Sequence, residues 1–197
     1  MMAETCLLEL RPRVSGQLWS FSPDQERTFK QSGVGGVKVD GDSKLLELRV
    51  HSGEKIVGAE FSSENKVALW TERGNIFILT LKSNHYWKLG KPGTVNCLAF
   101  VASDPVNIAV GLKTKRALVI NTQTGAVRRR FTESEDIRLV GSTGDVVFTL
   151  TSHHLTLFSL AEGHQLLRSD PDLYMTFCRY FKKLLIYCYS CGIRFMD

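Results

Sequence analysis

The sequence predicts an all-β fold built from repeats of about 39 residues, each containing four short strands. The first observation is a pentapeptide, since Leu7–Arg11 returns as Leu45–Arg49. The second is a Phe-Ser pair that begins at Phe21 and again at Phe61. The third is a short apolar run that ends in a small polar residue once per period, at Asp40, Thr80, Asn121, Ser159 and Asp197. Three sequence columns with one period indicate a repeat architecture.

Each unit has the pattern of four short strands separated by turn residues, as the third unit illustrates. We expect its strands at residues 95–101, 107–112, 117–121 and 126–131. Val, Ile and Phe dominate these runs, and turn residues such as Asp104-Pro105 and Thr124-Gly125 separate them. No window holds a sustained apolar period of a helix together with helix caps. A β-sandwich is the alternative, but it does not explain why the same residue types return in every unit.

We expect a single domain over residues 1–197. Its full units cover about residues 17–50, 56–89, 95–131 and 137–168, and residues 175–197 supply three strands of a fifth. Residues 6–11 have the pattern of a spare fourth strand.

These units resemble the WD40 repeat family of β-propellers. Trp19–Asp24 looks like that family's first strand and turn, Val37–Asp40 like its third strand, and Asn121–Gly125 like the turn after it. The units are degenerate. Val39, Leu79, Ile120, Phe158 and Met196 stand at the Trp of the family's Trp-Asp pair, and the Asp survives only at Asp40 and Asp197. The resemblance therefore implies propeller blades that pack through apolar residues, without the family's full Asp-His-Ser-Trp hydrogen-bond network.

The number of blades has two interpretations. If residues 6–11 complete the last unit, as an N-terminal strand commonly does in the family, the strands form a closed five-bladed ring. Propellers of this family usually have seven blades, which need about 280 residues at this period. The alternative is therefore a part of a larger propeller.

Composition narrows the class of protein. The chain has 197 residues, a net charge of +5, 43% hydrophobic residues and five cysteines. These values exclude a collagen, a mostly disordered chain and an integral membrane protein with helical spans. The N-terminus lacks a basic region followed by a long apolar stretch, and the odd cysteine count argues against a disulfide framework. We expect a cytosolic or nuclear protein that is not secreted.

Motifs for catalysis or metal binding are weak. A Gly-x-Ser-x-Gly elbow is missing, and the glycine-rich stretch at Gly33–Gly36 is expected to be a hairpin turn. Cys188 and Cys191 have the spacing of half a zinc site, with Cys178 as a possible third ligand, but buried strand cysteines are the simpler interpretation. His153-His154 is expected to be an exposed turn. We therefore expect no enzyme activity, no cofactor and no metal.

Basic residues concentrate between Ser83 and Thr132, where Asp104 is the only acid. We predict that they form a partner-binding surface on one blade: Lys88, Lys91, Lys113, Lys115, Arg116, Arg128, Arg129 and Arg130. The expected ligand is an acidic protein segment, with nucleic acid or anionic lipid head groups as alternatives. A solvated rim, in which the arginines protect a strand edge, is the simplest alternative.

Taken with the family resemblance, the sequence implies a non-catalytic scaffold that docks proteins on its loop face within a larger assembly. A substrate receptor of a ubiquitin ligase is a narrower version. A nucleic-acid-associated factor is the alternative from another class, although no stacking platform accompanies the basic residues. A hydrolase ranks last, because the inner strands repeat no Asp, Glu or His. Oligomerisation is compatible with any of these.

Overall fold

The structure, a computed structural model, describes residues 54–62, 65–80 and 86–168 with their side chains. Outside these ranges it describes the backbone of strands alone, within residues 20–49, at His85 and within residues 175–196. The expected closing strand at residues 6–11 and the glycines at positions 33 and 35 lie outside the described residues.

The described chain is all-β and contains no helix. The first sheet comprises β1 (Ser20–Phe21), β2 (Thr28–Gln31), β3 (Gly36–Asp40) and β4 (Leu46–Arg49). The second comprises β5 (Ile56–Phe61), β6 (Lys66–Thr71), β7 (Ile76–Thr80) and β8 (His85–Gly90). The third comprises β9 (Val95–Phe100), β10 (Asn107–Leu112), β11 (Arg116–Asn121) and β12 (Val127–Thr132). The fourth comprises β13 (Leu139–Thr143), β14 (Val146–Leu150), β15 (Leu155–Ser159) and β16 (Gln165–Arg168). The last has three strands, β17 (Met175–Phe181), β18 (Leu184–Tyr189) and β19 (Gly192–Met196).

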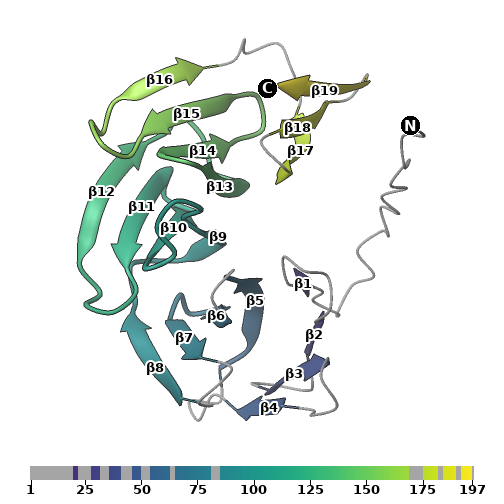
Figure 1. The fold of residues 1–197 in the computed structure, drawn as a ribbon, viewed down its shortest axis with the longest axis vertical. Coiled ribbons are helices and arrows are strands. Elements are labelled where there is room, and N and C mark those ends of the chain that lie inside the picture. Colours follow the sequence, from purple (N-terminus) through teal and green to yellow (C-terminus); the bar gives the residue numbers. More distant parts are fainter. Residues whose placement is uncertain are drawn as a thin grey trace.

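Within every sheet each strand pairs antiparallel with the next strand in the chain. The first strands of successive sheets lie against one another, β1 on β5, β5 on β9, β9 on β13 and β13 on β17. Figure 1 shows the described sheets following one another along an open arc, with β4, β8, β12 and β16 on its outer side. This arrangement is compatible with a propeller.

Two apolar clusters join neighbouring sheets. Trp70, Ile76 and Ile78 of the second sheet pack with Leu98 and Ile108 of the third. A further cluster joins the third sheet to the fourth, and in it the rings of Phe131 and Phe158 stack at 4.4 Å. Successive side chains of a strand point to opposite faces, so β10 places Ile108 in one cluster and Ala109 in the other. The middle strands are therefore buried on both faces, which explains their unbroken apolar runs.

The sequence located the strands of the third unit to within one residue at each end. The fourth unit differs at its start, because β13 begins at Leu139 rather than at Ile137. Ile137 is nevertheless fully buried, as part of the connection that leads into the strand. Apolar periodicity thus identified the buried residue but not the point at which ladder pairing begins.

Candidate interaction face

The turn between β10 and β11 presents three cations to solvent. We call Lys113–Arg116 the basic turn; all four of its residues are exposed. Lys115 adopts a left-handed backbone conformation with φ of 61°, which turns the chain back into β11. The backbone N–H of Lys113 donates to the carbonyl of Thr94 at 3.0 Å, and the carbonyl of Lys115 accepts from the N–H of Glu133 at 2.8 Å. The segments that enter and leave the third sheet therefore fix the backbone of the basic turn.

Lys91 joins this group, because the short connection from β8 to β9 that contains it ends at Thr94. Its side chain is exposed. We call Lys91, Lys113, Lys115 and Arg116 the basic face. Lys88 lies one sheet earlier, on β8, where its cross-strand partner is Phe77.

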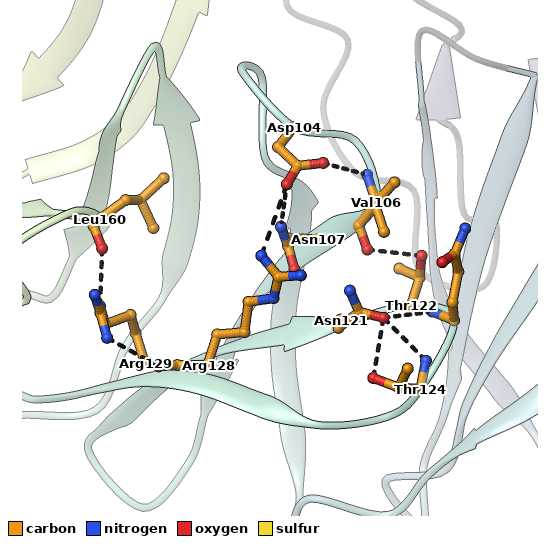
Figure 2. A network of polar contacts seen from close by, with 10 residues as sticks. Asp104, Val106, Asn107, Asn121, Thr122, Thr124, Arg128, Arg129 and Leu160 are labelled. Atoms are coloured by element: carbon orange, nitrogen blue, oxygen red, sulfur yellow. Dashed lines mark hydrogen bonds and ion pairs between the residues drawn. The ribbon is translucent and has the colours of Figure 1, made fainter.

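The three arginines of β12 have different environments although they are consecutive. Nη1 of Arg128 lies 3.9 Å from Oδ2 of Asp104, whose carboxylate also accepts from Val106 N–H and Asn107 Nδ2 (Figure 2). Arg129 reaches into the fourth sheet, where Nε donates to the Leu160 carbonyl at 2.8 Å and Nη2 to that of Ala161 at 2.6 Å. Arg130 is exposed opposite Leu118.

Arg129 has a counterpart in the second sheet. Trp87 occupies the equivalent position on β8, and its indole N–H donates to the carbonyl of Thr122 in the third sheet at 2.8 Å. In both cases an outer strand donates to the turn before the outer strand of the next sheet. Arg129 therefore links the third sheet to the fourth. A partner could bind its guanidinium only if these two hydrogen bonds were broken.

The eight predicted residues consequently do not form one patch. β11 runs from Arg116 to Asn121, so the basic turn and the β11–β12 turn lie at opposite ends of a strand about 16 Å long. Asn121 closes that far turn, with its Oδ1 accepting from the N–H groups of Gln123 and Thr124 (Figure 2). Lys113, Lys115 and Arg116 lie in one turn, Lys91 lies on the connection whose last residue, Thr94, bonds to that turn, and Arg130 lies on the neighbouring outer strand. Arg128 and Arg129 lie toward the other end of β12, and Lys88 lies on the second sheet.

Two carboxylate clusters, one buried around Glu54 and one half-buried around Glu135, flank the basic turn, and sequence reasoning missed both. Glu54, just before β5, accepts from Thr71 Oγ1 at 2.6 Å and from Asn75 Nδ2 at 2.7 Å. These bonds, from Thr71 first and Asn75 second, lower the pKa of Glu54, and the charges of Arg73 and Lys88 add to the effect. Each cluster ties the segment entering a sheet to the turn between the middle strands of that sheet.

In the fourth sheet the corresponding residue is Glu135. Its Oε1 lies 2.6 Å from Nδ1 of His153, and this hydrogen bond is the main reason why the pKa of Glu135 is lowered. Glu133, also buried, accepts a hydrogen bond from Thr149 Oγ1. A signal was present in the sequence, because Glu54 and Glu135 each stand two residues before a buried isoleucine.

His153-His154 does form the turn between β14 and β15, but the expectation of an exposed turn was wrong. Both side chains are half-buried. The connection from β12 to β13 folds over the turn, and Glu135 bonds His153 from that connection. Exposure of a turn depends on what covers it, and the covering segment lies 18 residues away in the sequence.

Metal ligands and reactive groups are few among the described side chains, where no group of three His, Cys, Asp or Glu could hold a metal ion. Cys178 and Cys188 lie on β17 and β18, but their side chains, and all of Cys191, lie outside the described residues. Burial raises the pKa of the Cys97 thiol to about 12.

In the part of the chain that the structure describes, no helix has the length and apolar character needed to cross a membrane.

Comparison with known proteins adds no assignment: no protein-family model matches the chain, and no curated protein matches it.

Proposed function

We propose that the chain is a non-catalytic interaction scaffold, a propeller of degenerate WD40-like blades that binds an acidic segment of a partner protein on its basic face. Repeated four-stranded sheets, with first strands adjacent along the inside of the arc, support the propeller. The sequence resemblance supports the WD40-like character of the blades. Both a five-bladed ring and a part of a larger propeller agree with this proposal.

The geometry of the basic turn is the main support for this proposed function. Its backbone is fixed on both sides by hydrogen bonds to Thr94 and Glu133, while its three cations extend into solvent. None of Lys113, Lys115 and Arg116 forms an ion pair with a described residue. Because the backbone is already ordered, an acidic ligand gains electrostatic attraction at little cost in loop ordering.

An extended acidic peptide fits the basic face better than a nucleic acid does. Binding of single strands commonly uses aromatic side chains on which bases stack. Among the described residues, the exposed large apolar side chains are Tyr86, Val127, Leu166 and Leu167, and none of them belongs to the basic turn. Charge without a stacking surface favours carboxylates as the ligand.

Fluorescence anisotropy with a labelled peptide rich in Asp and Glu tests this proposal. The variant is Lys113→Glu/Arg116→Glu, which keeps Lys115 because of its left-handed backbone. Each exposed ion pair contributes about 0.2–1 kcal/mol, and each reversal replaces an attraction with a repulsion. We therefore expect a loss of about 1–3 kcal/mol, or roughly 5- to 150-fold in Kd, and a weaker salt dependence.

The matched control is Lys55→Glu/Arg138→Glu, which makes the same change in net charge at two exposed cations, one just before β5 and one just before β13. It should retain most of the affinity. Equal losses in both variants would mean that net charge alone drives binding, and the proposed face would be wrong. A single-stranded oligonucleotide that binds more tightly than the peptide, and loses affinity on reversal of Lys113 and Arg116, would identify nucleic acid as the ligand instead.

A further inference from the structure

Thr132, the last residue of β12, lies directly across the sheet from the basic turn. Its cross-strand partner is Arg116, and its side chain is exposed. The Thr132 hydroxyl forms no hydrogen bond with the residues that the structure describes. Opposite residues of an antiparallel pair have Cβ atoms about 4.5–5.5 Å apart, so a group added to Thr132 lies within reach of the Arg116 guanidinium.

The residues before Thr132 form a second feature. Arg129 and Arg130 stand three and two residues before the hydroxyl, in the order Arg-Arg-Phe-Thr. Arg130 lies on the same face of β12 as Thr132, because alternate residues of a strand share a face. Phe131, between them, points into the apolar cluster shared with the fourth sheet. Consecutive arginines at fixed distances before a hydroxyl are a charge pattern by which protein kinases select substrates.

We propose that Thr132 is a phosphorylation site for an arginine-directed Ser/Thr kinase, and that its phosphate masks the basic face. The masking part rests on the proposed function. In the reaction, Thr132 Oγ1 forms a bond to the γ-phosphorus of ATP, and the bond from that phosphorus to the β,γ-bridging oxygen breaks. ADP leaves with the bridging oxygen, and the hydroxyl proton passes to the catalytic aspartate of the kinase.

Local structure selects an arginine-directed kinase over an acid-directed one. Of the three acids that follow Thr132, the two nearest are already engaged, because Glu133 is buried and accepts from Thr149 and Glu135 is bonded to His153; only Asp136, four residues away, is exposed. Arg130 forms no ion pair with a described residue and is exposed on an edge strand that is already extended. Arg129 must release the carbonyls of Leu160 and Ala161 before a kinase can bind it. Phosphorylation should therefore be slow, and its extent is the useful measurement.

The effect on the basic face follows from charge. A phosphothreonine carries about −1.5 to −2 at neutral pH and accepts charge-assisted hydrogen bonds from guanidinium groups. Arg116 and Arg130 are placed to donate those bonds. The net charge of the basic turn and the phosphate together is then about +1, compared with +3 for the turn alone, which leaves little attraction for an acidic ligand.

The test incubates the full chain, Thr132→Ala, Arg130→Gln and Ser134→Ala with ATP and the catalytic domain of a kinase that requires arginines two and three residues before its acceptor. Mass spectrometry should locate phosphate on Thr132 in the parent chain and in Ser134→Ala, but not in Thr132→Ala, and Arg130→Gln should incorporate at least tenfold less. Phosphate on Ser134 instead, or no incorporation, would refute the site.

Masking is then measured with the acidic peptide used above. Phosphorylated chain should bind it at least tenfold more weakly than untreated chain, and phosphatase should restore binding. Unchanged affinity after stoichiometric phosphorylation would refute masking. A chain that never binds the acidic peptide would refute the proposed function and the masking with it, while the location of the phosphate would still decide whether Thr132 is the kinase site.

Discussion

Replacement of Gly141 by alanine should destabilise the fold, although the same change in an ordinary strand stabilises it. Gly141 lies on β13 opposite Phe148 of β14. A Cβ atom at position 141 would lie 2.2 Å from Cζ of that ring and 2.8 Å from two further ring carbons. Ordinary carbon contacts are about 3.5–4.0 Å, so the ring must move by about 1 Å or more. Phe148 is only 2% exposed, and because protein interiors are close-packed, that movement displaces neighbouring side chains.

The expected change in the free energy of unfolding is the difference between two opposing effects. Overpacking of a buried site costs about 1–3 kcal/mol. Alanine also restricts the unfolded chain more than glycine does, which recovers about 0.4–1 kcal/mol. The net loss should be about 1–2 kcal/mol, or roughly 2–8 °C in Tm for a chain of this size.

Urea denaturation followed by tryptophan fluorescence measures the change, with thermal unfolding as a second readout. Phe148→Leu, which shortens the side chain, is the matched background, and Gly141→Ala should cost at least 0.5 kcal/mol less in it. Gly58→Ala provides a repeat of the experiment, since a Cβ there would lie 1.8 Å from the Trp70 indole. Gly141→Ala that stabilises the chain in both backgrounds would show that β13 and β14 do not pair in this register.

Two further predictions concern titratable groups. The pKa of Glu135 is lowered below its ordinary 4.5, mainly by the hydrogen bond from His153. The ionised carboxylate therefore stabilises the fold at pH values above 4.5, and this stabilisation is lost as the pH falls through the pKa of the folded state. The free energy of unfolding should therefore fall more steeply between about pH 5 and about pH 3 in the parent chain than in Glu135→Gln; equal slopes in urea titrations would contradict the contact. Burial raises the pKa of Cys97 from 9.0 to about 12, so iodoacetamide at about pH 8 should label it only after denaturation. Rapid labelling of Cys97 in the folded chain, located by mass spectrometry, would show that the thiol is more accessible than its half-buried position on β9 implies.

The strands were predictable because the two features that define them, an apolar run and the turn residues at its ends, are both local in the sequence. Apolar runs such as Asn107–Leu112 are bounded by turn residues, and their burial on both faces removes the need for alternation. The repeat added a check, since a strand assigned in one unit had to recur in the others. The start of β13 was less predictable, because Ile137 is buried before ladder pairing begins.

The basic residues show where sequence reasoning stops. Arg128, Arg129 and Arg130 are indistinguishable in sequence, yet one pairs with Asp104, one bonds two carbonyls of the next sheet, and one is exposed. Those partners lie 24 to 32 residues away or on another sheet, so only the packing of sheets decides among the three. The carboxylate clusters of Glu54 and Glu135 were missed for the same reason, since their partners come from the turn between later strands.

Hydrogen–deuterium exchange with and without the acidic peptide tests the central claim, binding at the basic face, most directly. Exchange should slow at the backbone amides of residues 113–116 and of the neighbouring segments 91–94 and 133–135, because a bound ligand covers them and holds their hydrogen bonds closed. Amides of the β11–β12 turn, residues 122–126, should exchange at the same rate in both states. Slowed exchange at residues 122–126 with no change at 113–116 would contradict the claim and move the binding surface to the opposite end of the third sheet.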